Sequence, residues 1–197
     1  MKGLKVRLLG DPVLCAKAKE IETVDDSIRE LSRQMIQTMY DSNGIGLAGN
    51  QVGVLRRIVV IHIDPATDEE GRVLPPGSPG EAELLPKMPI TLINPEIVSY
   101  SSEQCSWEEG CLSVPKLYAE VVRSRRIVLK SELLDGSRIL LECGGLLARC
   151  VQHELDHLDG IVFVEKAEEE GYAKILPGIQ KLLRKNGHRN FTVRRRS

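Results

Sequence analysis

Apolar residues along the chain recur with two different periods, and these periods predict its elements. Helical spacing predicts helices over residues 25–42, 146–158 and 174–184. Short runs rich in β-branched residues predict strands over residues 57–63, 91–99, 117–122, 126–132, 137–142 and 161–164. Asp135-Gly136 is typical of a hairpin turn between two of these strands. Because most strands follow one another instead of alternating with helices, the pattern predicts an α+β fold with antiparallel sheets.

Residues 64–89 interrupt this pattern. They contain six of the ten prolines and three glycines, so we expect a long surface loop there. The strands on both sides of the loop resume the same core. Residues 1–197 are therefore predicted to form a single domain, with a basic C-terminal helix and tail at about 174–197.

The composition argues against several classes of function. Lys and Arg total 27 against 28 Asp and Glu, and only 4% of residues are aromatic, which is unlike a dedicated nucleic-acid binder. No apolar run approaches the roughly 18 residues of a membrane span, and the charged N-terminus is unlike a secretion signal. Five cysteines are an odd number, unsuited to a closed disulfide framework. We therefore expect a cytoplasmic protein with free thiols and no membrane partner.

The predicted helix over 146–158 carries the strongest chemical signal, His153-Glu154-Leu155-Asp156-His157. Two histidines four residues apart lie on one face of a helix, so both imidazoles can bind one metal ion. Glu154 is adjacent to the first histidine and can take a proton from an attacking water without being a ligand. Because this helix is largely apolar, we expect it to be central and buried, where unpaired polar groups are costly. The motif therefore predicts a metal site with hydrolytic chemistry.

A third metal ligand is needed, and the sequence offers several candidates. One large branch of zinc peptidases uses a histidine six residues after the second one, but that position is Phe163 here. Cys111 is favoured, because a thiolate binds zinc or ferrous iron well and the preceding glycine allows close approach of the backbone. The remaining candidates are Cys105, Cys143, Cys150, Glu165, Glu168, Glu169 and Glu170.

A glycine-rich stretch occupies residues 44–51. Its glycines match the spacing of a dinucleotide-binding fingerprint, but a helix precedes them and a strand follows, where that fingerprint needs the reverse order. We interpret the stretch either as a simple turn or as a loop whose backbone passes close to a substrate while Gln51 presents its amide.

The three motifs together, in this order, resemble the peptide deformylase family. The family pattern contains Gly-x-Gly-x-Ala-x-x-Gln, Glu-Gly-Cys-Leu-Ser and Gln-His-Glu-x-Asp-His-Leu, which occur here at residues 44–51, 109–113 and 152–158. Residues 10–14 also look like the N-terminal segment of the family, so the resemblance spans roughly residues 5–165. The chain departs from many relatives at Gly49-Asn50, where they have Ala-Pro, and at Tyr118, where some bacterial members have Arg.

The resemblance implies removal of the formyl group from the N-terminal formylmethionine of newly synthesised proteins, with release of formate. It implies antiparallel sheets packed around a central metal-binding helix, which agrees with the predicted strands. The implied metal ligands are Cys111, His153 and His157. The implied metal is Fe²⁺, with Zn²⁺, Ni²⁺ or Co²⁺ as substitutes.

The resemblance also implies roles for residues around the metal. Glu154 would be the general acid/base, while Gln51 and the backbone N–H of Leu112 would stabilise the oxyanion. The residues that we expect to contact the peptide and its methionine side chain are Ile45, Gly46, Gly110, Leu146 and Cys150.

Two other functions would use the same residues. A metallopeptidase with this site would cleave peptide bonds, and a metal-stabilised binding module would catalyse nothing. Glu154 argues against the binding module, because a structural metal site needs no carboxylate beside its ligand. The expected partners are N-formylmethionyl nascent peptides and, through the basic C-terminal tail, the ribosome. The sequence leaves the oligomeric state open.

Overall fold

The structure, a computed structural model, describes residues 3–187 and residue 193. In this part of the chain the α-helices are α1 (Asp26–Asp41), α2 (Pro79–Leu84), α3 (Gly145–Leu158) and α4 (Glu169–Lys185). The strands are β1 (Gly46–Ala48), β2 (Ile58–Ile61), β3 (Ile90–Tyr100), β4 (Gln104–Cys111), β5 (Val114–Ser124), β6 (Ile127–Leu133) and β7 (Arg138–Cys143). The 3-10 helices are η1 (Pro12–Cys15), η2 (Gly49–Val52), η3 (Leu85–Lys87) and η4 (Phe163–Glu165).

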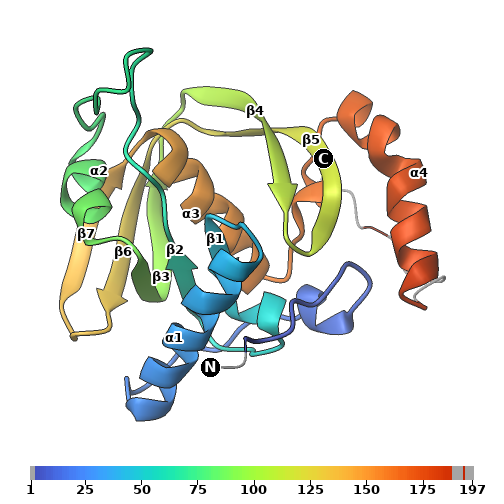
Figure 1. The fold of residues 1–197 in the computed structure, drawn as a ribbon, viewed down its shortest axis with the longest axis horizontal. Coiled ribbons are helices and arrows are strands. Elements are labelled where there is room, and N and C mark those ends of the chain that lie inside the picture. Colours follow the sequence, from blue (N-terminus) through green and yellow to red (C-terminus); the bar gives the residue numbers. More distant parts are fainter. Residues whose placement is uncertain (1–2, 188–192, 194–197) are drawn as a thin grey trace.

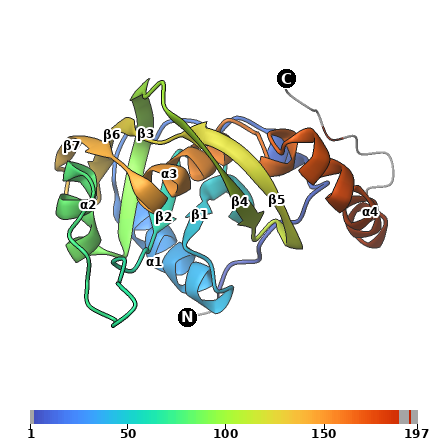
Figure 2. The ribbon, with the colours of Figure 1, turned by 90° about the horizontal axis from the view of Figure 1, so that it is seen from above.

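Antiparallel pairing divides the strands into two groups. Five strands form one sheet in the order β1-β2-β3-β6-β7, and β4 pairs with β5 in a separate hairpin. Helix α3 lies between the large sheet and the hairpin (Figure 1). Figure 2 shows α2 beside β7 at one end of the molecule and α4 beside β5 at the other. The predicted α+β fold, with antiparallel sheets around a central helix, is confirmed.

The short strand β2 shows how one sheet contributes to two cores. Side chains alternate between the two faces of a strand. Ile58 and Val60 accordingly join the apolar cluster that contains Met35 of α1. Val59 and Ile61 point the other way and join the cluster that contains apolar residues of α3. Helix α3 therefore sits on an apolar surface that fixes its position relative to the sheet.

The helices α1 and α3 begin differently. The Asp25 carboxylate accepts a hydrogen bond from the Ile28 N–H and caps α1, as Asp commonly does at this position. Helix α3 starts after Gly144, which has no side chain that could cap it. Instead, the Ser78 hydroxyl accepts the Gly144 N–H at 3.0 Å. A residue from the proline-rich segment thus supports the start of the central helix.

Several local predictions were wrong. Residues 161–164 are not a strand: Phe163 and Val164 are the first two residues of η4, and all four apolar side chains are buried without ladder pairing. The proline-rich segment 64–89 is not only loop, because it contains α2 and η3. Helix α4 begins at Glu169, five residues before the predicted start, and contains Pro177. Strands β1 and β4 were not predicted.

Part of the predicted basic tail, residues 188–192 and 194–197, lies outside the described residues. Within the described part of the chain, none of the helices has the length and apolar character needed to cross a membrane.

Candidate metal centre and active site

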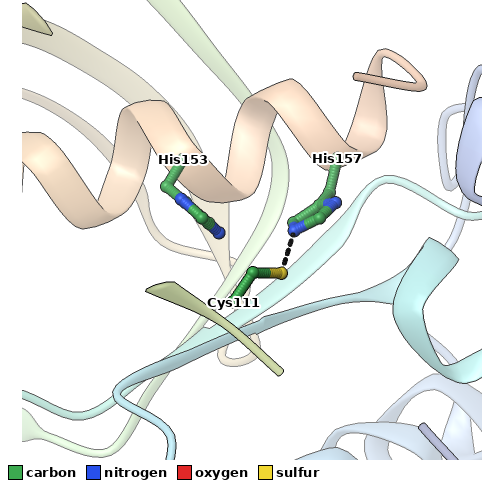
Figure 3. A group of neighbouring side chains, drawn as sticks. All are labelled: Cys111, His153 and His157. Atoms are coloured by element: carbon green, nitrogen blue, oxygen red, sulfur yellow. Dashed lines mark hydrogen bonds between the residues drawn. The ribbon is translucent and has the colours of Figure 1, made fainter. Parts of the chain in front are cut away.

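The two histidines of α3 meet a cysteine from the hairpin. His153 and His157 lie one turn apart, with ring centroids 5.0 Å apart. Cys111 is the last residue of β4 and points toward both rings (Figure 3). Its Sγ lies 3.2 Å from Nε2 of His157. One potential ligand atom from each residue lies within 4.8 Å of the other two, so the predicted ligands are brought together.

These three residues fit a divalent transition metal. Metal–ligand bonds of about 2.0–2.3 Å place tetrahedral ligand atoms about 3.3–3.5 Å apart, close to the separation of Cys111 Sγ and His157 Nε2. Burial lowers the pKa of His157 well below its usual range, which keeps the ring neutral as a metal ligand must be. One thiolate and two imidazoles are a good donor set for zinc or ferrous iron. The other cysteines and the carboxylates considered as third ligands are not part of this group.

A buried carboxylate holds His153 in place, and sequence reasoning missed it. Glu109 Oε2 lies 2.9 Å from Nδ1 of His153, which leaves Nε2 as the ligand atom. Arg123 donates to both oxygens of Glu109 at 2.6 and 2.9 Å, and Arg149 donates to one of them at 2.7 Å. Burial alone would raise the pKa of Glu109, but His153 and Arg123 outweigh it and hold that pKa far below its usual range. The position of Glu109 in the sequence, two residues before Cys111, is the signal that could have indicated its place beside the ligands.

Glu154 is the other carboxyl group of this region. It is buried, and its Oε2 has no hydrogen-bond partner in the described part of the chain. Burial is the main reason that its pKa is raised to about 7. A Cβ on Gly46 would collide with Oε1 of Glu154, so the glycine provides the space that the carboxyl group occupies. This carboxyl group is free to interact with a molecule that enters the site.

Gln51 presents its amide to the same site from η2. Its Oε1 accepts the Ala48 N–H at 2.8 Å, which fixes the orientation of the amide. The Nε2 group therefore points toward the ligand cysteine and donates to Cys111 Sγ at 3.4 Å and to Ser113 Oγ at 3.2 Å. Gln51 is thus a hydrogen-bond donor beside the proposed metal position.

A cavity of about 620 Å³ opens beside the three ligands. Predicted site residues that line it are Ile45, Gly46, Gln51, Gly110, Cys111, Leu112, Leu146, Cys150, His153 and Glu154. His157 lies behind this lining and is fully buried. Trp107, Tyr118 and Arg149 also line the cavity and were not predicted to do so. Trp107 and Tyr118 are among the exposed large apolar residues, so the wall of the cavity is partly aromatic.

Comparison with known proteins gives a consistent result. Residues 4–172 match the sequence model described as polypeptide deformylase. The chain is 44% identical over 167 residues to peptide deformylase 2 of Gloeobacter violaceus, covering 85% of this chain and 80% of that protein. It is also 44% identical over 166 residues to a peptide deformylase of Dictyoglomus thermophilum, covering 84% and 94% of the two chains.

Solved structures agree with the sequence matches. A plant peptide deformylase superposes with a TM-score of 0.79 at 31% identity, covering 100% of this chain and 98% of that one. A peptide deformylase from Ehrlichia chaffeensis superposes with a TM-score of 0.78 at 36% identity, covering 94% and 97%. Together with the Cys/His/His metal site, to which β4 contributes the cysteine and α3 both histidines, these matches show that the chain belongs to the peptide deformylase family of metal-dependent hydrolases.

Proposed function

We propose that Cys111, His153 and His157 hold one divalent metal ion for the deformylase activity of this chain, and that Glu154 moves the proton. The activity is removal of the formyl group from N-terminal formylmethionine. The observation that carries the proposal is the placement of Glu154: a buried carboxyl group with an unpartnered oxygen lines the same cavity as two of the ligands. A purely structural metal site has no use for such a group.

The residues support a hydrolysis in which one water molecule adds to the formyl carbon and the C–N bond breaks. When bound, the metal supplies Lewis-acid polarisation and makes a hydroxide nucleophile accessible near neutral pH. Glu154 accepts the proton of the attacking water and returns it to the departing amine, so the products are formate and a free N-terminus. The Gln51 amide and the Leu112 backbone N–H donate to the formyl oxygen as negative charge develops on it.

The cavity supports selectivity for a formylated methionine. The side chains of Ile45, Leu146 and Cys150 line it and offer apolar contacts for the methionine side chain. Gly46 and Gly110 line the same cavity and are proposed to contact the peptide backbone. A Cβ at either position would collide with a side chain of the cavity, Glu154 or Tyr118, so both positions require glycine. A formyl carbon carries only hydrogen where an internal peptide carbonyl carries a chain, so the formyl group needs less room beside the metal ligands.

An assay that measures two products tests this function against the peptidase alternative. Formyl-Met peptides should release formate, and unformylated peptides of the same sequence should release no new amine. Cleavage of the unformylated peptides at a comparable kcat/KM would favour the peptidase. Release of neither product by metal-loaded protein would favour a binding module.

The working metal that we propose is Fe²⁺. The donor set suits Fe²⁺ and Zn²⁺ alike, so affinity does not decide between them. Protein reconstituted anaerobically with Fe²⁺ should have the higher kcat/KM on a formyl-Met peptide. It should lose activity in air, because oxidation of the iron or of the Cys111 thiolate dismantles the site. The Zn²⁺ form should survive air, because zinc has no redox chemistry. Equal activity of the two forms, or an air-stable ferrous form, would contradict this assignment.

Residues 1–197 are proposed to act as one catalytic domain in the cytoplasm, with a basic C-terminal end that contacts the ribosome. The last turns of α4 expose Lys181, Arg184 and Lys185, and further arginines of the tail lie outside the described residues. Binding to ribosomal RNA through such a cluster weakens with salt. Deletion of residues 186–197 should reduce co-sedimentation with ribosomes at low salt while kcat/KM on a free peptide stays the same. Undiminished co-sedimentation would exclude a ribosome contact that depends on residues 186–197.

A further inference from the structure

Asn50 lies next to Gln51 and is fully buried, with 0% of its surface exposed. Its Nδ2 group donates to the carbonyl of Ala16 at 2.6 Å and more weakly to that of Val13 at 3.4 Å. Both acceptors are backbone groups of the N-terminal segment 12–18. Asn50 therefore ties η2, which presents the Gln51 amide, to a segment that is far away in the sequence.

The N-terminal segment is itself fixed to the metal-binding helix. The Ala18 N–H donates to the carbonyl of Leu158, the last residue of α3, at 2.8 Å. His157, one of the ligands, directly precedes this residue. The bonds of Asn50 thus connect the Gln51 loop to the end of α3 through segment 12–18.

The energetics of Asn50 argue against a role in stability alone. Its Oδ1 is buried and has no hydrogen-bond partner in the described part of the chain. A buried acceptor without a partner costs free energy comparable to what a hydrogen bond contributes. The unpartnered Oδ1 therefore offsets part of what the bonds of Nδ2 contribute to folding. The two bonds of Nδ2 also fix the direction of η2 relative to segment 12–18.

We propose that Asn50 is a positioning residue for the oxyanion donor: it holds η2 so that the Gln51 amide faces the reacting carbonyl. This inference rests on the proposed role of Gln51. A hydrogen-bond donor acts on the transition state only if it is held at the right place, and a misplacement of about 1 Å can cost about 100-fold in rate. In this chain, the hydrogen bonds of the Asn50 side chain hold η2, which carries the donor Gln51.

A double-mutant cycle between Asn50→Ala and Gln51→Ala tests the proposal. Gln51→Ala should lower kcat by about 100-fold or more, as loss of an oxyanion donor does. Asn50→Ala should lower kcat by about 10-fold with little change in KM, since the loss is in the transition state. In the double variant, kcat should lie within about threefold of the Gln51→Ala value, because Asn50 has no donor left to position. Metal content is measured for each variant, so that loss of metal is not mistaken for loss of positioning.

Hydrogen exchange provides a readout that does not depend on activity. The Gly53 N–H bonds to the carbonyl of Asn50, and the Val54 N–H bonds to that of Gly49. In Asn50→Ala these two amides should exchange faster, while amides of α1 and β6 should keep their protection. Asn50→Ser, which retains a shorter donor, should show intermediate exchange and intermediate kcat. If Asn50→Ala does not fold, Asn50→Ser takes its place in the same measurements.

Asn94→Gly is the matched control. Asn94, on β3, makes two similar bonds with the backbone of Ile21, which follows segment 12–18, at 2.8 and 2.9 Å, but it does not adjoin Gln51. Glycine accommodates its φ of 47°. This variant should leave kcat unchanged. If Asn50→Ala and Gln51→Ala are additive in kcat, or if Asn94→Gly lowers kcat equally, the positioning role is wrong. If Gln51→Ala alone retains kcat, the proposed function of Gln51 fails and the inference fails with it.

Discussion

Glu109 and Glu154 are both buried carboxyl groups that line the same cavity, yet their pKa values move in opposite directions. Glu109 accepts hydrogen bonds from two arginines and lies against His153, so it stays ionised and orients a ligand. Glu154 is buried and keeps an oxygen without a partner in the described part of the chain, and burial is the main reason that its pKa is raised. Residue type alone does not separate these roles; the neighbours that the fold supplies do.

This difference predicts that Glu154 can be replaced without loss of the metal. Glu154→Ala should bind one equivalent of metal and lose at least about 100-fold in kcat, because a positioned acid/base contributes about that much. Metal content and formate release on the same preparation check this. Glu170→Gln, which changes an exposed carboxylate of α4, should behave as the unchanged chain. Near-normal turnover of Glu154→Ala with full metal content would remove Glu154 from the mechanism.

The sequence indicates the elements well where one periodic pattern dominates. Helix α3 was predicted to within one residue, because its apolar face and its two histidines share the helical period. Strand β4 was not predicted, since its sequence QCSWEEGC mixes charged and apolar residues and most of its side chains are exposed or half-buried. The third ligand lies at the end of this strand, so its proximity to α3 follows from tertiary pairing that no local pattern encodes.

Two shorter elements show the same limit. The apolar run 161–164 has the composition of a strand, but all four side chains are buried and its last two residues begin the 3-10 helix η4. Prolines suggested loop throughout 64–89, although Ser78-Pro79 is also a good helix start, with a capping hydroxyl followed by proline at the first helical position. The proline content of residues 64–89 favours a loop more strongly than this capping signal favours a helix, so the sequence does not predict α2.

The capping role of Ser78 leads to a prediction about stability. The Ser78 hydroxyl accepts the Glu81 N–H within α2 and the Gly144 N–H at the start of α3. Ser78→Ala should leave the buried Gly144 N–H unpaired and cost about 1–2 kcal/mol of unfolding free energy. For a chain of this size that corresponds to a Tm lower by about 2–8 °C in a thermal melt. Ser137→Ala, at an exposed hairpin turn, should change Tm much less. An equal Tm for Ser78→Ala and the unchanged chain would show that the hydroxyl carries no capping energy.

At the scale of the whole molecule, the metal site joins two separately packed parts. The hairpin β4–β5 packs with α4 around one apolar cluster. Helix α3 packs against the large sheet around another. Cys111 comes from the hairpin and both histidines come from α3 (Figures 1 and 3). A metal ion held by all three residues therefore connects the two parts, and its binding free energy adds to the stability of their arrangement.

Removal of the metal should consequently destabilise the whole fold and not only abolish activity. A ligand that binds the folded state alone stabilises it by about 2.7 kcal/mol at 100 times its Kd, which for this chain length raises Tm by about 5–10 °C. Thermal melts of chelator-treated protein, with and without added Zn²⁺, measure this difference.

Glu154→Ala should show the same metal-dependent rise in Tm, because Glu154 is not a ligand. Cys111→Ser should lose most of it. Cys143→Ala is the matched thiol control: burial raises the pKa of Cys143 to about 12, and this core thiol should not affect the rise. A Tm that does not respond to metal in the unchanged chain would mean that the hairpin and α3 are held together without the ion.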